Sequence, residues 1–142
     1  MVTGRQTESS PTALIERLQQ AINQRDLDVL VGCFDPAYQS EFPAHPDRAF
    51  SGYDQVRKNW SQIFSAVPDI EVVLVRCTSE GDTAWAEWEW RGTHVDGTLF
   101  HMRGVTIQGV QQDRITWARL YMEPVQEGAG IDAAVRQSLA GR

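Results

Sequence analysis

The spacing of apolar residues changes at Pro68, from a helical period before it to strict alternation after it. Before that point, a period of about 3.6 residues predicts three helices. Their expected positions are a helix that begins at Ser10–Pro11, a short helix after the N-cap Asp26 that ends at Asp35–Pro36, and a helix from Tyr53 to about Ala66. A short strand is expected over residues 37–42.

After Pro68, apolar and polar residues alternate in four segments, residues 69–79, 83–94, 97–110 and 114–124. The turn signals between them are Glu80-Gly81-Asp82, Asp96-Gly97 and Gln112-Asp113. Helices followed by an antiparallel meander indicate an α+β domain with the helices on one face of the sheet. The expected organisation is a disordered tail (1–10), one domain (11–124), and a Gly-rich hinge with a C-terminal helix (125–142, helix 131–140).

Composition and charge narrow the classes of partner. A chain of 142 residues that is 42% hydrophobic suits one domain with a substantial core. The net charge of −6 and the absence of a basic run exclude a nucleic-acid partner. No apolar run reaches the roughly 18 residues of a membrane helix, and the N-terminus lacks a signal-peptide pattern, so we expect a cytoplasmic protein. The two cysteines lack a metal-binding or redox spacing, and we expect neither a metal nor another cofactor.

The turn at Asp96-Gly97 predicts which strand residues lie opposite one another. A two-residue hairpin turn there pairs Trp90 with Arg103 and Trp88 with Val105. Continued through the next turn, this register predicts an inner face made of Ala86, Trp88, Trp90, His94, His101, Arg103, Val105, Ile107, Ala118, Leu120 and Met122. The outer face then carries Trp85, Glu87, Glu89, Arg91, Phe100, Met102, Trp117, Arg119, Tyr121 and Glu123.

Four segments resemble the SnoaL-like branch of the NTF2-like superfamily. They are AINQRDLDVLVGCFDP, FSGYDQVRKNW, WRGTHVDGTLFHMRGV and DRITWARLYMEP, and the resemblance covers roughly residues 12–124. It implies a cone, in which three N-terminal helices pack on a curved antiparallel sheet and enclose a pocket, with a short C-terminal helix added here. The superfold hosts isomerases, dehydratases, epoxide hydrolases, cyclases and non-enzymes, so the resemblance predicts the fold more sharply than the activity.

The expected outer face combines charged groups with several large aromatic side chains. A solvated face rarely carries Trp85, Phe100, Trp117 and Tyr121 together, so we expect a homodimer formed through this face, as the family resemblance also implies. The alternative is the partly exposed outer face of a monomer.

Arg103 is the one charged residue that the register places on the inner face, where we expect Trp90 to lie under its guanidinium. A buried guanidinium needs an anion. Glu41 or Asp35 supplies that anion if Arg103 belongs to the core, and a ligand carboxylate or enolate supplies it if Arg103 belongs to a binding site. The sequence leaves both alternatives open.

Two residues are candidates for acid–base catalysis, His101 and Glu41. A neighbouring arginine disfavours protonated imidazole, so His101 is expected to be a neutral donor or base; a purely structural histidine is the alternative. In the superfamily the strand over residues 37–42 borders the pocket, which makes Tyr38 and Glu41 candidates, although strand alternation admits only one of them. His45, between two prolines, is expected near the cone mouth.

The leading hypothesis is a small-molecule pocket protein that binds a hydrophobic or aromatic oxygenated ligand. Its enzymatic form is a cofactor-free isomerase, cyclase or dehydratase, because the sequence offers no paired inner carboxylates and no Ser-His-Asp order. The alternative is a non-catalytic ligand-binding or dimeric interaction module whose cone is filled by its own tryptophans. The expected binding residues are Tyr38, Trp60, Trp88, Trp90, Arg103, Leu120 and Met122.

Overall fold

The computed structural model describes residues 10–140 and contains four α-helices in this range. These helices are α2 (Pro11–Asn23), α3 (Leu27–Gly32), α4 (Tyr53–Ala66) and α5 (Ile131–Leu139). A short 3-10 helix, η1 (Pro46–Arg48), precedes α4. Residues 1–9 of the expected tail (1–10) and the last two residues of the C-terminal segment lie outside the described residues.

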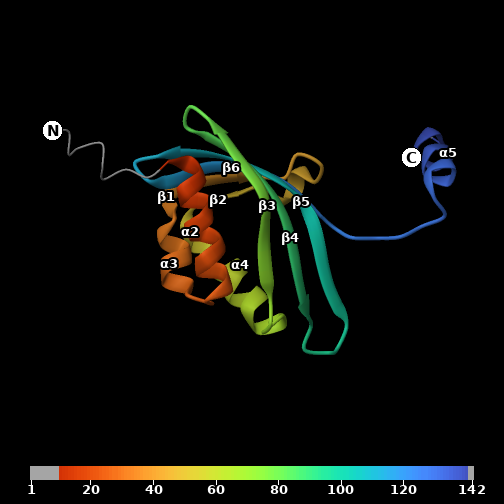
Figure 1. Cartoon of the computed structure of the whole chain (residues 1–142), viewed down its shortest axis with the longest axis horizontal. Coiled ribbons are helices and arrows are strands. Elements are labelled where there is room, and N and C mark those ends of the chain that lie inside the picture. Colours follow the sequence, from red (N-terminus) through yellow and green to blue (C-terminus); the bar gives the residue numbers. More distant parts are fainter. Residues whose placement is uncertain (1–9, 141–142) are drawn as a thin grey trace.

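Six strands form one sheet in the order β2-β1-β6-β5-β4-β3. Their bounds are β1 (Phe34–Glu41), β2 (Phe50–Ser51), β3 (Glu71–Glu80), β4 (Thr83–Thr93), β5 (Leu99–Gln111) and β6 (Arg114–Pro124). All pairs are antiparallel except β1–β6, which is parallel. Helices α2, α3 and α4 gather on one side of the sheet, which curves beside them (Figure 1). The predicted α+β architecture of three helices on a curved sheet is confirmed.

Local capping explains where the first two helices begin. The Ser10 hydroxyl accepts a hydrogen bond from the Ala13 amide at 3.1 Å, and Pro11 occupies the first helical turn. The Asp26 carboxylate accepts from the Val29 amide at 3.2 Å and so caps α3, as predicted. The predicted end of this second helix at Asp35–Pro36 is wrong. Helix α3 ends at Gly32, and β1 begins at Phe34.

The predicted register between β4 and β5 is wrong by one residue. The hairpin loop contains three residues, because the His94 amide donates to the Thr98 carbonyl and the Gly97 amide donates to the His94 carbonyl, both at 2.8 Å. Gly97 adopts a positive φ of 91°, the bulge position of a three-residue hairpin loop. Trp90 therefore lies opposite Met102, and Trp88 lies opposite Gly104.

A shift of one residue turns every side chain of a strand to the other face of the sheet. His101, Arg103, Val105 and Ile107 therefore lie on the outer face, and Phe100 and Met102 lie on the inner face, opposite to the prediction. The two-residue turn at Gln112-Asp113 is present, with both residues at positive φ. A β-bulge then shifts the β5–β6 register by one residue. The two shifts cancel in β6, whose inner residues Ala118, Leu120 and Met122 were predicted correctly.

The core lies between the helices and the inner face of the sheet. Leu14, Ile15, Leu30, Ile70 and Ile115 are completely buried there. Helix α5 lies apart from this body at the end of an extended segment (Figure 1), and its apolar residues are exposed: Ile131, Val135 and Leu139. None of the helices in the described residues is both long and apolar enough to span a bilayer.

Candidate functional site

The helices and the inner face of the sheet enclose a cavity of about 200 Å³, which we call the cone cavity. Its lining is mostly apolar, and aromatic side chains contribute from four elements, β1, β2, α4 and β4. The lining residues are Leu18, Ile22, Phe34, Tyr38, Ser40, Phe42, Arg48, Phe50, Val56, Asn59, Trp60, Ile63, Trp88, Trp90, Met102, Thr106, Gln108, Ala118, Leu120 and Met122. Predominantly apolar walls with a few polar groups are typical of small-molecule sites.

The lining residues differ in exposure, and we call the buried ones the closed end and the exposed or partly exposed ones the open end of the cone cavity. At the closed end every lining residue is buried, and this end includes Tyr38, Ser40, Thr106, Gln108 and Ala118. The lining residues of the open end are partly or fully exposed: Phe42, Arg48, Asn59, Trp60, Trp90, Met102 and Leu120. Strand register places Ser40 beside Ala118 and Ala118 beside Gln108, so the small Ala118 side chain separates two polar residues.

A buried hydrogen-bond chain crosses the closed end. The Trp88 indole N–H donates to the Thr106 hydroxyl at 2.8 Å, and the Gln108 amide nitrogen donates to the same hydroxyl at 2.6 Å. The Gln108 amide oxygen has no hydrogen-bond partner among the described residues. A buried unpaired acceptor costs free energy, so this oxygen is a candidate contact for a bound molecule.

Tyr38 contributes a buried phenol to the same end. Burial raises the pKa of Tyr38 to about 12, against the opposing effect of a hydrogen bond with Ser40. A phenol with so high a pKa stays protonated at neutral pH and offers a neutral hydrogen-bond donor.

Aromatic rings and one cation form the open end. Trp60 and Trp90 contact each other edge to face, with ring centroids 5.5 Å apart, and the Trp90 indole N–H has no hydrogen-bond partner in the described structure. Arg48, in the short turn η1, is exposed, and its side chain makes no hydrogen bond or ion pair with any of residues 10–140. The open end therefore offers donors, and the closed end offers an unpaired acceptor.

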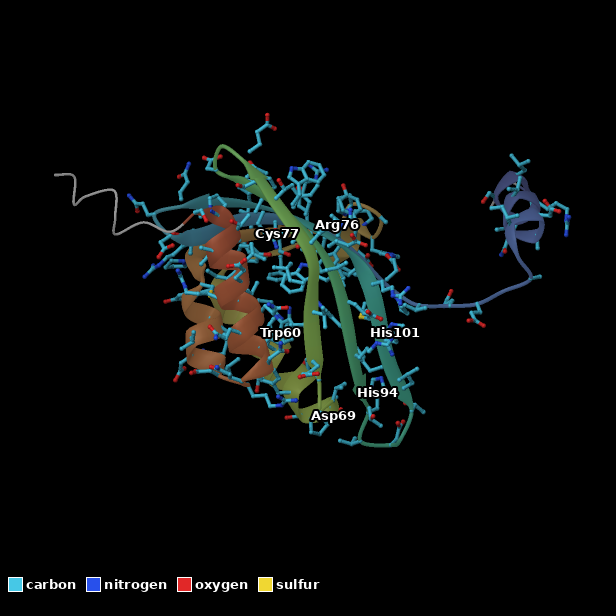
Figure 2. All side chains as sticks on the ribbon, in the orientation of Figure 1. Trp60, Asp69, Arg76, Cys77, His94 and His101 are labelled. Atoms are coloured by element: carbon cyan, nitrogen blue, oxygen red, sulfur yellow. The ribbon has the colours of Figure 1, made fainter. Side chains whose placement is uncertain are left out.

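The prediction that Arg103 and His101 lie on the pocket wall is wrong. Both side chains contact Glu89 on the outer face: the His101 imidazole Nε2 at 2.7 Å and an Arg103 guanidinium nitrogen at 3.1 Å. Arg91 joins the same carboxylate at 2.8 Å. Figure 2 shows Trp60 between the helices and the sheet, whereas His101 lies on β5, away from them. The three-residue hairpin loop is the cause, because it reverses the faces of β5.

The His101 hydrogen bond and, after it, the Arg103 hydrogen bond lower the pKa of Glu89 to about 2. The carboxylate is thus the centre of the group formed by Glu89, Arg91, His101 and Arg103, which we call the Glu89 cluster. The predicted stacking of Arg103 on Trp90 does not occur, because the two residues lie on opposite faces.

The sequence left open whether Tyr38 or Glu41 faces the cavity, and the structure shows that Tyr38 does. Tyr38, Ser40 and Phe42 line the cone cavity, whereas Glu41 is exposed and pairs with Arg119 at 3.7 Å. Of the two candidates, Glu41 therefore lies outside the cavity, and its candidate role as a catalytic residue there is wrong. His45 pairs with Glu123 at 2.8 Å and is not among the lining residues, and His94 packs edge to face on Phe100 near the hairpin loop.

Six of the predicted binding residues line the cone cavity: Tyr38, Trp60, Trp88, Trp90, Leu120 and Met122. Sequence reasoning missed Arg48, Met102, Thr106 and Gln108. The last three were missed because the predicted register turned Met102 outward and left Thr106 and Gln108 off the inner face. One signal was present in the sequence. Met102, Thr106 and Gln108 alternate together along one strand, so a three-residue hairpin loop turns all three to the inner face.

Comparison with known proteins finds the same architecture in a protein family and in solved structures. A family model described as a SnoaL-like domain matches residues 15–118. The sequence has no match among curated proteins. Wild-type IdmH from Streptomyces antibioticus, described as a candidate polyketide cyclase, superimposes with a TM-score of 0.72 at 20% identity, over 81% of this chain and 93% of that chain.

Two further solved structures are similar over more of this chain. A candidate SnoaL-like polyketide cyclase from Jannaschia sp. CCS1 has a TM-score of 0.69 at 20% identity, over 95% of this chain and 94% of its own. A candidate ketosteroid isomerase from Kribbella flavida DSM 17836 has a TM-score of 0.67 at 16% identity, over 93% and 88%. At these identities the structural likeness establishes the fold alone.

Proposed function

The chain belongs to the SnoaL-like domain family, and on that premise we propose that its cone cavity binds one small aromatic, oxygenated molecule. The observation that carries the proposal is the unfilled volume of about 200 Å³ between aromatic walls. A cavity of about 150 Å³ with apolar walls is large enough to take up benzene. This volume also counts against the alternative of a cone filled by its own tryptophans.

The chemistry of the lining supports binding more directly than catalysis. Among the described lining residues there is no carboxylate, imidazole or thiol, and the only ionisable side chains are those of Tyr38 and Arg48. General acid–base catalysis needs a group that exchanges a proton near the working pH. Tyr38, with a pKa of about 12, is suited to donate a hydrogen bond and not to remove a proton.

In an isomerase, cyclase or dehydratase, one lining residue, Tyr38, would have a catalytic role. The neutral Tyr38 phenol would donate a hydrogen bond to a substrate carbonyl and stabilise the negative charge that develops on its oxygen. The IdmH and Jannaschia structures, both described as candidate polyketide cyclases, favour this form as the second candidate. This enzymatic form requires a general base, and none of the described lining residues supplies one.

The proposal is tested by filling the cone cavity. Ala118→Phe adds a ring at the closed end, and we expect it to abolish binding of toluene and 4-methylphenol in ligand-observed NMR titrations. The matched control is Ala37→Phe, which adds the same ring at an exposed position of β1 outside the lining. We expect the control to bind both probes as the unchanged protein does.

Stability distinguishes a filled cavity from a damaged fold. Filling an existing cavity commonly raises the free energy of unfolding by about 0.5–2 kcal/mol, so Ala118→Phe should retain or raise the melting temperature. Unchanged binding in Ala118→Phe with a normal melting temperature would contradict the proposal.

A further inference from the structure

The hydrogen-bonding state of the closed end specifies one functional group of the ligand. The Thr106 hydroxyl oxygen accepts two hydrogen bonds, from Trp88 and Gln108, so its own hydrogen remains available to donate. Beside it, the Gln108 amide oxygen is an acceptor without a partner in the described structure. A donor and an unpaired acceptor side by side are complementary to a hydroxyl group, which donates one hydrogen bond and accepts another.

Burial makes the Thr106 and Gln108 side chains selective for a ligand hydroxyl group. Gln108 is 4% exposed and Thr106 is 4% exposed, so water competes little for either group. A buried polar site built to bond a ligand hydroxyl discriminates against an analogue that lacks it, because the protein groups are then left unpaired.

The open end specifies a second group. Arg48 is the only cation among the described lining residues, and no described residue neutralises its guanidinium. Trp90 belongs to the same group of lining residues, and its indole N–H is a buried donor without a partner in the described structure. A guanidinium and an indole N–H are both donors without acceptor capacity, so they are complementary to an anion such as a carboxylate.

The walls of the cone cavity are aromatic: Trp60 and Trp90 are in edge-to-face contact at the open end, and Trp88 is buried. Aromatic rings pack favourably with such walls in offset or edge-to-face geometry. These aromatic walls therefore fit an aryl ring better than a charged or strongly hydrated segment.

We infer that the cone cavity selects a hydroxylated aryl carboxylate, with its hydroxyl at Thr106 and Gln108, its ring among the tryptophans, and its carboxylate at Arg48. This inference rests on the proposed function and specifies the substrate class of the same site. It moves the anion-binding role from Arg103, which lies in the Glu89 cluster, to Arg48.

The ligand series 4-hydroxyphenylacetate, phenylacetate, 4-methylphenol and toluene tests the inference on the unchanged protein. Relative to 4-hydroxyphenylacetate, loss of the hydroxyl should raise Kd about tenfold. Loss of the carboxylate should raise it about fivefold, a smaller factor because the cation is exposed. Ligand-observed NMR titration measures all four values, and longer acids such as 4-hydroxycinnamate extend the series.

Two variants assign these preferences to their residues. Arg48→Met should remove the preference for 4-hydroxyphenylacetate over 4-methylphenol, and Arg114→Met, at an exposed arginine outside the lining, should keep it. Gln108→Met should remove the preference for 4-hydroxyphenylacetate over phenylacetate. If Gln108→Met does not fold, the ligand series on the unchanged protein decides the hydroxyl preference by itself.

The possible failures are distinguishable. Equal Kd values for all four probes would overturn this inference and leave the proposed function standing, because toluene would still occupy the cone cavity. An equal loss of 4-methylphenol and 4-hydroxyphenylacetate binding in Arg48→Met would also overturn it. Absence of binding for every probe, toluene included, would overturn both the inference and the proposed function.

Discussion

Glu89 shows how one carboxylate organises its neighbours on the outer face of the sheet. It accepts hydrogen bonds from His101 and Arg103 and pairs with Arg91, and these contacts hold its pKa near 2. A carboxylate whose pKa is lowered in the folded state stabilises the fold at pH values above its unfolded pKa of about 4.5, and this contribution is lost as the pH falls toward 2.

Glu89→Gln removes this ionisation, so the difference in melting temperature between the unchanged protein and the variant should shrink as the pH is lowered from 7 to 3. The unchanged protein should be the more stable of the two at pH 7. Thermal melts by circular dichroism at several pH values measure the difference. A difference that stays constant over this range would show that the Glu89 cluster does not depend on the charge of Glu89.

Individual residues were predictable where a single strand or helix decided their direction. Trp88 and Trp90 were placed on the inner face because alternation within β4 separates them from Glu87 and Glu89. Arg103 and Gln108 were misplaced because their direction depends on the length of a loop that precedes both. Arg48 lies in a loop stiffened by prolines, where no periodicity indicates a direction.

At the scale of elements, the types and approximate positions of helices and strands followed from their periods of 3.6 and 2. The length of the β4–β5 loop did not follow from the sequence, because Asp96-Gly97 suits a two-residue and a three-residue hairpin equally. In the structure Asp96 accepts from the amide and the hydroxyl of Thr98, at 3.0 and 2.7 Å, and the Val95 amide donates to the carbonyl of Ala66 in α4. The contact with α4 is tertiary and leaves no local pattern.

Close strand contacts constrain β5 at Gly104, which lies between Trp88 on β4 and Met122 on β6. A Cβ atom at this position would meet the Tyr121 carbonyl oxygen and lie 2.7 Å from the Met122 Cα, both of them backbone atoms that cannot rotate away. Gly104→Ala should therefore lower the free energy of unfolding by roughly 1–3 kcal/mol.

The control for this prediction is Gly128→Ala, where no atom lies within 4 Å of an added Cβ. Urea denaturation of both variants gives the two free energies. Equal stability of Gly104→Ala and Gly128→Ala would indicate that β5 and β6 are less closely paired than the register requires.

At the scale of the whole molecule, the outer face of the sheet carries large side chains that the chain itself leaves exposed. Trp85, Trp117 and Tyr121 are 48%, 36% and 40% exposed. We propose that this face forms a homodimer interface, since aromatic side chains are enriched in such interfaces.

Analytical ultracentrifugation tests the dimer. The unchanged protein should sediment near 32 kDa, twice the chain mass of 16.0 kDa, and Trp117→Glu should shift it to the monomer because an unpaired charge would be buried in the interface. Trp117→Phe is the control and should remain dimeric. A monomeric unchanged protein at micromolar concentration would contradict the proposal.

The most direct test of the central claim uses the two methionines that line the cone cavity, Met102 and Met122. With ¹³C-methyl methionine labelling, addition of 4-methylphenol should shift both methyl resonances and produce intermolecular NOEs from them to the ring of the probe. Met102→Leu assigns the two signals. NOEs from both methyl groups would establish that the ligand lies inside the cone, whereas binding without any NOE to either methyl group would place it elsewhere and contradict the account.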